Sequence, residues 1–353
     1  MPGAQASRAR VARRIATAAA YGGGGIGLLG VGVAGVLLTE SRLAIRAIGL
    51  LEGDPPRADG VYGEAFADPA DTRPPVRLLF LGDSTAAGLG VLRGHETPGA
   101  LLACGLASVA ERRVRLHNVA ASGARSCDLA GQVRRALAFR PELAVIMVGA
   151  NDVTRRSPAS QAVGLLADAV ATLRGAGCEV VVGTCPDLGT IKPVRPPLRW
   201  VARRVSRQLA AAQTIAVVEA GGRTVSLGSL LGPEFAARPE MFAADRYHPS
   251  AQGYATAAMA LLPSLCAALE VWPEETGRSG PVQGDAVLPV AVAAAAAAGQ
   301  SGTEVVAVGP DGGRRWAQLR HRLRLGLPGA GASPEPEAAS ANSHPGAGDA
   351  GAT

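Results

Sequence analysis

The sequence is poor in aromatic residues, which make up only 3% of its 353 residues. No run of basic residues is interleaved with aromatic side chains, the pattern that combines phosphate neutralisation with base stacking. The excess of basic over acidic residues is small, 35 against 29, and much of it lies at the two ends of the chain. We therefore expect no nucleic-acid partner.

Cysteine is also scarce, and the five cysteines form no Cys-x-x-Cys pair and have no histidine cluster near them. A zinc site is not expected, nor is any other metal or cofactor. Cys178 and Cys185 flank a predicted strand, which would hold them roughly 23 Å apart, beyond the reach of a disulfide. Cys104, Cys127 and Cys266 leave one disulfide open for an exported domain. Otherwise the cysteines are interpreted as small buried hydrophobes.

Nucleotide-binding signatures are missing as well. The glycine-rich stretch from Gly82 to Gly90 is not followed by Gly-Lys-Ser/Thr, and its glycines do not have the dinucleotide-binding spacing. The chain shows no internal repeats and no long apolar insertion of the kind that forms a lid.

The N-terminus carries a basic segment, residues 1–14, followed by residues 15–38, which contain no charged side chain. These 24 residues are long enough to cross a bilayer, although their many glycines lower helix propensity. No small-x-small cleavage site follows Leu38, so we predict an uncleaved transmembrane anchor, with a cleaved secretory signal as the alternative. The arginines before the segment favour a cytoplasmic N-terminus, which places the rest of the chain outside the cell membrane.

Three further regions follow the predicted anchor. Residues 39–74 become rich in Pro, Gly and Asp and are interpreted as a linker. Residues 75–271 have the patterning of a folded domain. Residues 272–353 are rich in Pro, Gly and Ala and are predicted to be largely disordered. Within this tail, the arginine-rich stretch 314–325 is typical of a solvated segment or of one attracted to anionic lipid.

Strand-like and helix-like segments alternate through residues 75–271. The predicted strands are Val76 to Leu81, Val114 to Val119, Leu143 to Val148, Glu179 to Gly183 and Thr224 to Leu227. The predicted helices are Thr97 to Arg112, Leu129 to Phe139, Ala159 to Gly175, Leu198 to Val218 and Pro249 to Glu270. This alternation predicts an α/β fold in three layers, with a parallel sheet of about five strands covered by helices on both faces.

The first predicted strand ends at a Gly-Asp-Ser turn, which leaves Ser84 at the carboxyl edge of the sheet, where open α/β folds bind their ligands. A simple helix-capping role for Ser84 is the alternative. A serine nucleophile needs a base, and among the five histidines only His248 has an aspartate, Asp245, three residues upstream at the start of a helix. The alternative for this pair is an N-cap and a surface histidine.

Four separated blocks carry a wider resemblance. They are Gly82-Asp83-Ser84, the Gly123 of Asn118-Val119-Ala120-Ala121-Ser122-Gly123, Gly149-Ala150-Asn151-Asp152, and Asp245-Arg246-Tyr247-His248-Pro249. In this order the blocks resemble the SGNH hydrolase family, also called GDSL esterases and lipases. The resemblance covers residues 75–271 and implies a flavodoxin-like three-layer α/β/α fold.

The resemblance also implies roles for individual residues. Ser84 would be the nucleophile, His248 its base and Asp245 the acid that orients the histidine. The oxyanion hole would consist of the backbone N–H groups of Ser84 and Gly123 and the side-chain amide of Asn151, groups that donate hydrogen bonds without gaining charge. The remaining motif residues, Gly82, Asp83, Gly149 and Asp152, would shape the turns that hold these groups.

The expected function is therefore hydrolysis of carboxylic esters, of short or medium acyl chain length, through an acyl-enzyme on Ser84. The substrate would be a small-molecule, lipid or carbohydrate ester. Acyl transfer to an alcohol or sugar and carbohydrate deacetylation would use the same site and stay open. A membrane-tethered binding protein without turnover is disfavoured, because Ser84, Asn151, Asp245 and His248 are all present. Oligomeric state is left open.

Overall fold

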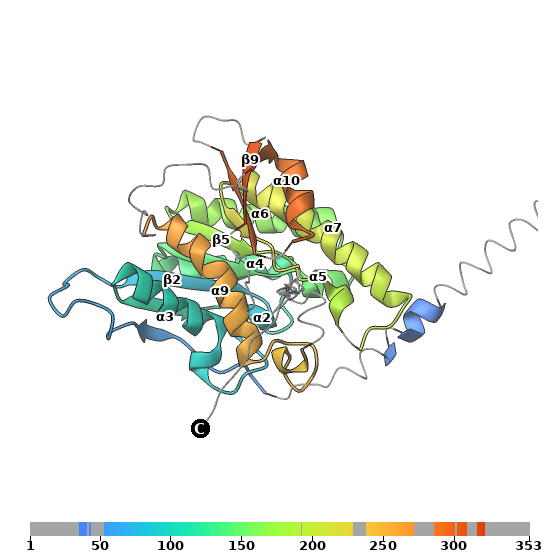
Figure 1. Cartoon of the computed structure of the whole chain (residues 1–353), viewed down its shortest axis with the longest axis horizontal. Coiled ribbons are helices and arrows are strands. Elements are labelled where there is room, and N and C mark those ends of the chain that lie inside the picture. Colours follow the sequence, from blue (N-terminus) through green and yellow to red (C-terminus); the bar gives the residue numbers. More distant parts are fainter. Residues whose placement is uncertain are drawn as a thin grey trace, which may run out of the picture. The chain divides into compact units, whose positions relative to one another are not determined.

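The computed structural model describes residues 35–40, 42–43, 53–191, 193–228, 238–271, 286–300, 302–308 and 316–321. All of them belong to one compact unit, Met1–Leu323, and the second unit, Arg324–Thr353, lies outside the described residues. In the described residues a nine-stranded sheet, ordered β1-β3-β2-β4-β5-β6-β8-β9-β7, carries helices on both faces (Figure 1). The predicted three-layer α/β/α fold is confirmed.

Five parallel strands form the centre of the sheet, as the sequence predicts. They are β3 (Val114–Asn118), β2 (Val76–Gly82), β4 (Leu143–Met147), β5 (Glu179–Gly183) and β6 (Arg223–Val225). Strand β2 shows why such a strand is apolar along its length: Leu78 and Phe80 pack into the core on one face, and Leu79 and Leu81 into the core on the other. A strand buried on both faces has no alternation of apolar and polar residues.

The helices divide between the two faces. Helices α3 (Pro98–Ala110) and α9 (Ala251–Ala268) cover one face, and α4 (Leu129–Ala136), α6 (Ala159–Gly175) and α7 (Leu198–Glu219) cover the other (Figure 1). The short α2 (Ser84–Ala87) and α5 (Ala150–Thr154) follow β2 and β4 directly. Single 3-10 turns are η1 (Gly94–Glu96), η2 (Ser126–Asp128), η3 (Leu137–Phe139), η4 (Leu188–Thr190) and η5 (Pro239–Met241).

Both edges of the sheet extend beyond the predicted domain. At one edge, β1 (Gly60–Tyr62) pairs antiparallel with β3, so part of the predicted linker 39–74 belongs to the sheet. At the other edge, the chain adds β7 (Ala286–Pro289), helix α10 (Val290–Ala297), β8 (Thr303–Ala307) and β9 (Trp316–His321). The prediction that residues 272–353 form a disordered tail is wrong for these elements.

Contacts between distant segments explain this difference. Helix α10 consists only of alanine and valine, and its Ala293 and Ala297 are buried in a small core that includes Val218 of α7 and Val305 of β8. Glu304 of β8 is buried and forms an ion pair with Arg223 of β6, with 3.3 Å between the nitrogen and oxygen atoms. Local composition carries no sign of either contact, so the segment looks unstructured in the sequence.

The predicted anchor, residues 15–38, lies outside the described residues except for residues 35–38, which are helical. Among the helices that the structure describes, none combines the length and the hydropathy of a membrane span. No disulfide joins any of the five cysteines, so the one left open among Cys104, Cys127 and Cys266 is not formed. Of these three only Cys266 is buried.

Candidate active site

Ser84 lies where β2 ends, at the first residue of α2. The turn before it depends on Gly82, whose φ is +131° and whose backbone leaves no room for a side chain, because a Cβ there would lie 1.9 Å from the carbonyl oxygen of Met147. Asp83 then caps α2, with its carboxylate accepting a 2.9 Å hydrogen bond from the Thr85 N–H. The turn therefore holds Ser84 at the carboxyl edge of the sheet.

Ser84, His248 and Asp245 lie in hydrogen-bonding contact although 164 residues separate the serine from the histidine. The Ser84 Oγ lies 2.9 Å from His248 Nε2, and His248 Nδ1 lies 2.5 Å from Asp245 Oδ2. The other oxygen of Asp245 accepts hydrogen bonds from the backbone N–H groups of Tyr247 and His248, both at 3.0 Å. This arrangement, a hydroxyl facing an imidazole that a carboxylate orients, is the geometry that activates a serine.

The two aspartates near the serine differ in their electrostatics. Burial alone would raise the pKa of Asp245, but hydrogen bonds from the His248 side chain and from the backbone of Tyr247 and His248 outweigh it, so the pKa lies below its ordinary value. Burial raises the pKa of Asp83 to about 6, against a weaker opposing effect of the Thr85 N–H. Asp245 is thus held as the carboxylate that an imidazolium needs beside it.

Gly123 and Asn151, predicted for an oxyanion hole, follow β3 and β4, the two strands that flank β2 in the sheet. The loop after β3 is tied to β2, because the Ala121 N–H donates to the Gly82 carbonyl oxygen at 3.1 Å. Gly123 follows in that loop with a φ of +77°. The Asn151 Nδ2 donates to the Ala124 carbonyl oxygen at 3.0 Å, which joins the two loops. An amide nitrogen carries two hydrogens, so Asn151 retains a second donor for a substrate.

The motif residues Gly149 and Asp152 lie behind these groups. The Asp152 carboxylate is buried and accepts hydrogen bonds from the N–H and the hydroxyl of Ser126, at 3.0 and 2.9 Å. Gly149 is the N-cap of α5, and a Cβ there would lie 2.8 Å from the Cβ of Cys185. Neither residue contacts Ser84 in the hydrogen bonds of the described residues, and both fix the loops that carry the donors.

Two buried glutamines, which sequence reasoning missed, brace the strand ends that carry the site. Gln132 of α4 accepts from the Gly82 N–H at 2.8 Å and donates to the Gly82 carbonyl oxygen at 2.9 Å. Gln213 of α7 accepts from the Cys185 N–H at 2.8 Å and donates to the Val148 carbonyl oxygen at 3.0 Å. The only signal in the sequence is a glutamine on the apolar side of each helix, beside Val133 in α4 and Val217 in α7.

The loop after α2 fits closely against the loop that carries His248. A Cβ on Gly90 would lie 2.5 Å from the Pro249 carbonyl oxygen and 3.1 Å from the His248 Cβ. The fully buried Tyr254 of α9 donates its hydroxyl to the Leu89 carbonyl oxygen at 2.6 Å. These contacts fix the separation of Ser84 and His248, and sequence reasoning did not identify Gly90 or Tyr254 for this role.

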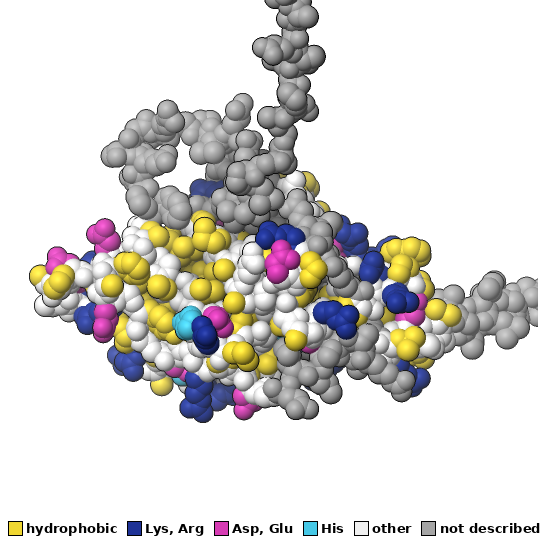
Figure 2. Space-filling view, turned by 60° about the horizontal axis from the view of Figure 1, so that its bottom comes forward, with side chains coloured by type: hydrophobic (Ala, Val, Ile, Leu, Met, Phe, Trp, Pro, Cys, Tyr) yellow, Lys and Arg dark blue, Asp and Glu magenta, His cyan; other side chains and the backbone are white. Residues whose placement is uncertain are grey.

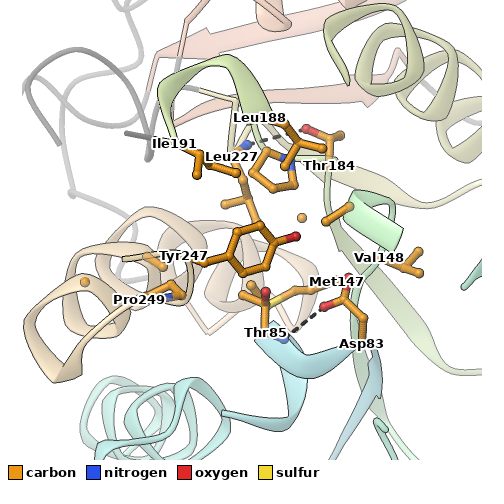
Figure 3. Close-up of a pocket in the computed structure, with 15 residues that line it drawn as sticks. Asp83, Thr85, Met147, Val148, Thr184, Leu188, Ile191, Leu227, Tyr247 and Pro249 are labelled. Carbon is orange, nitrogen blue, oxygen red and sulfur yellow. Dashed lines mark hydrogen bonds between the residues drawn. The ribbon is translucent and has the colours of Figure 1, made fainter. Parts of the chain in front are cut away.

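A small cavity of about 50 Å³ lies behind the Asp83 turn, at the carboxyl ends of β4 and β5. In Figure 3 the ring of Tyr247 projects into it, with Asp83 and Thr85 on one side and Leu188 and Leu227 on the other. The neighbouring Tyr247 and His248 rings contact each other edge to face, with their centroids 4.8 Å apart. Tyr247 therefore connects the base to the apolar interior beside the site.

A larger groove of about 630 Å³ begins at Tyr247 and Asp152 and runs between α5, η4 and the N-terminal half of α7. Its lining is mostly aliphatic, and the helical residues Leu37 and Leu38 close its far side. Val194 and Leu198, from the segment that leads into α7, are part of this lining. Among the described residues, no group of three His, Cys, Asp or Glu side chains is arranged as a metal site.

The model of the GDSL-like lipase and acylhydrolase family matches residues 80–256. GDSL-like esterase Rv1075c of Mycobacterium tuberculosis is 44% identical over 262 residues, which cover 72% of this chain and 83% of that protein.

Solved structures with a similar fold include a variant of Axe2, an acetylxylan esterase from Geobacillus stearothermophilus. It has 21% identity and a TM-score of 0.43, over 54% of this chain and 93% of the other. Another is LAE5, an alpha/beta hydrolase enzyme from the metagenome of Lake Arreo, Spain, with 21% identity and a TM-score of 0.45, over 56% of this chain and 95% of the other.

Proposed function

Because the chain belongs to the GDSL-like lipase and acylhydrolase family and is a hydrolase acting on esters, we propose that Ser84 is its nucleophile. The Ser84 Oγ attacks the acyl carbonyl carbon while His248 Nε2 takes the hydroxyl proton. The C–O bond to the alcohol then breaks, and the alcohol leaves with that proton. Water then attacks the acyl-enzyme while His248 takes one of its protons. The acid leaves, and His248 passes that proton to the Ser84 Oγ.

The hydrogen-bonded series Ser84, His248 and Asp245, at 2.9 and 2.5 Å, is the single observation that carries this proposal. The Asp245 carboxylate, whose pKa is held low, stabilises the imidazolium that forms when His248 takes the proton. The backbone N–H groups of Tyr247 and His248 also bond the Asp245 carboxylate, so acid and base are held together within one loop.

The oxyanion is proposed to accept hydrogen bonds from the backbone N–H groups of Ser84 and Gly123 and from the free amide hydrogen of Asn151. The contact of Asn151 with the Ala124 carbonyl supports this, because it orients the amide before substrate binds. One donor of this kind is typically worth about 3 kcal/mol of transition-state stabilisation.

The acyl chain is proposed to lie in the groove between α5, η4 and α7. The groove is aliphatic and begins at neighbours of the reacting groups, Tyr247 beside His248 and Asp152 beside Asn151. Apolar walls of this kind favour alkyl chains over sugars, so we propose carboxylic esters with short or medium acyl chains as substrates.

We also propose that residues 15–38 anchor the protein in the cell membrane, with the catalytic domain outside. The uncharged 24-residue segment and the arginines that precede it support this topology. Protease treatment of intact cells and of permeabilised cells tests it. Digestion of the catalytic domain in intact cells agrees with the proposal, and protection until permeabilisation contradicts it.

Hydrolysis of p-nitrophenyl esters of increasing chain length by the full chain, beside Ser84→Ala, tests the chemistry. We expect turnover that disappears in the variant, and fluorophosphonate labelling that needs both Ser84 and His248. Undiminished hydrolysis by Ser84→Ala would overturn the assignment. Adding an alcohol acceptor and analysing the products separates hydrolysis from acyl transfer on the same site.

A further inference from the structure

The N-terminal half of α7 and the helical residues before it expose an unusual set of apolar side chains. Of the twelve large apolar side chains that are exposed in the described residues, six lie here: Val36, Leu38, Leu43, Trp200, Val201 and Val205. Trp200 is 66% exposed, the highest value among these six. Scattered apolar residues are normal on a surface, but a cluster with an exposed tryptophan indicates an interaction site.

The two segments are joined, so these side chains form one surface. The Leu198 N–H at the start of α7 donates a 2.9 Å hydrogen bond to the Glu40 carboxylate. Leu38, Val201 and Val205 also line the same groove. We call this surface, together with the exposed Arg42, Arg195 and Arg204, the basic apolar face.

The charge of the face is positive. Arg203 and Arg207, on the side of α7 that faces the η4 loop, both bond one oxygen of the buried Asp187, at 3.1 and 2.9 Å. One carboxylate balances only one of these two guanidinium groups, and Arg195 and Arg204 add to the excess. Figure 2 shows dark-blue and yellow side chains interspersed at the end of the molecule where α7 begins.

The position of the face in the chain identifies its partner. The uncharged stretch 15–34 leads directly into residues 35–40, which contribute to the face. An exposed tryptophan, aliphatic side chains and arginines on one helix are the composition of segments that lie in a membrane interface. Arginines at such a surface attract anionic headgroups.

We propose that the basic apolar face docks on the surface of an anionic lipid bilayer, with Trp200 inserted at the headgroup level. The acyl groove opens between the same residues, so docking would present it to chains from the bilayer. The docking itself holds whether or not the ester chemistry proposed above is right, because it uses none of the reacting residues.

Fluorescence of the full chain on vesicles tests the docking. The difference in emission between the protein and Trp200→Phe isolates Trp200, and vesicles of phosphatidylcholine with phosphatidylglycerol and brominated phosphatidylcholine report its contact with lipid. We expect brominated lipid to quench this emission about twofold or more, and the quenching to weaken with added salt or without phosphatidylglycerol.

Arg204→Glu supplies the electrostatic test, and we expect it to reduce the Trp200 quenching to less than about half. Met259→Trp is the matched control, since Met259 is exposed on α9, which covers the other face of the sheet. Brominated lipid should not quench the additional emission from the tryptophan at position 259.

Vesicle flotation separates the possible failures. A protein that floats with vesicles while its Trp200 stays unquenched would keep the anchor and overturn the docking proposal. A protein that floats neither with vesicles that contain phosphatidylglycerol nor with vesicles that lack it would overturn both the anchor and the docking proposal. Equal quenching of Trp200 and of the tryptophan at 259 would show nonspecific adsorption and would also overturn it, and self-association without lipid would assign the face to a second copy instead.

Discussion

The site formed by Ser84, His248 and Asp245 and the groove between α5, η4 and α7 lie side by side, and each is stabilised by a different kind of interaction. The side-chain polar atoms of Ser84, His248 and Asp245 all have hydrogen-bond partners. The groove between α5 and α7 is formed by aliphatic side chains that constrain shape without direction. Directional bonds tolerate little displacement, whereas apolar walls accept a range of ligands. The chemistry should therefore be sensitive to single atoms, and substrate choice should respond to volume.

The largest effect should follow removal of the base. We expect His248→Ala to lower kcat by about 10⁴-fold or more, because Ser84 then has no group to take its proton. Binding of a non-hydrolysable alkyl ligand in the groove should change little, which titration of both proteins would measure. His95→Ala, an exposed histidine, is the control that should keep full activity. Substantial turnover by His248→Ala would contradict the proposed mechanism.

A smaller loss should follow removal of one oxyanion donor. We expect Asn151→Ala to lower kcat about 100-fold with little change in KM, because the amide contributes mainly in the transition state. Asn151→Asp keeps the shape but places a carboxylate near the oxyanion, so its loss should be greater. Steady-state kinetics on one short ester distinguishes the two, and equal kcat values for Asn151→Ala and the unaltered protein would remove Asn151 from the oxyanion hole.

Filling the groove should alter selectivity and leave the chemistry intact. Ala202 of α7 lines the groove. Ala202→Trp should reduce hydrolysis of the longest accepted ester about tenfold, while hydrolysis of the acetyl ester stays within about twofold of that by the unaltered protein. Gln208→Trp, at an exposed position of the same helix, is the matched control and should leave the chain-length profile unchanged. An unchanged profile in Ala202→Trp would place the acyl chain elsewhere.

The smallest effect concerns the pH dependence of stability, in which Asp83 and Asp245 act in opposite directions. Burial raises the pKa of Asp83 from 3.8 to about 6, so between these values the folded protein binds a proton that the unfolded chain has lost. Its stability therefore falls as the pH rises through this window. We expect Asp83→Asn to lose this dependence and to gain up to about 3 kcal/mol relative to the unaltered protein at pH 7.

Urea unfolding of both proteins at pH 4 and pH 7 measures the effect. Asp245 acts in the opposite direction, since its lowered pKa contributes stability above its unfolded pKa that is lost as the pH falls through its folded pKa. An Asp83→Asn protein with the same pH dependence as the unaltered one would show that Asp83 ionises normally in the folded state.

Local signals in the sequence were sufficient for the central fold and for the motif positions. Strands β2 and β4 are apolar runs that end in glycine-containing turns, and the motifs with Gly82 and Gly149 occupy those turns. The carboxyl ends of parallel strands share one edge, so Ser84, Gly123 and Asn151 could be placed near one another without coordinates. Their chemical roles remain a prediction.

Contacts between distant residues were not predictable in this way. Gln132 binds Gly82 across 50 residues, and Glu304 pairs with Arg223 across 81. A glutamine or glutamate in a helix or strand reads as a surface residue unless its partner is known. The full groove could not be placed for the same reason, because Val153 and Leu209 line it from two helices that no sequence pattern relates.

The added strands have a consequence for the smallest fragment that can stand alone. Strand β8 covers the edge of β6, and the loop after β6 is held by hydrogen bonds between Ser226 and residues Gly302 and Thr303. A fragment ending at residue 271 would keep all proposed reacting groups but bare the backbone of β6 along an apolar edge, a template for sheet-to-sheet aggregation. The segment that contains all proposed reacting groups therefore ends some fifty residues before the segment that completes the sheet, which ends with β9.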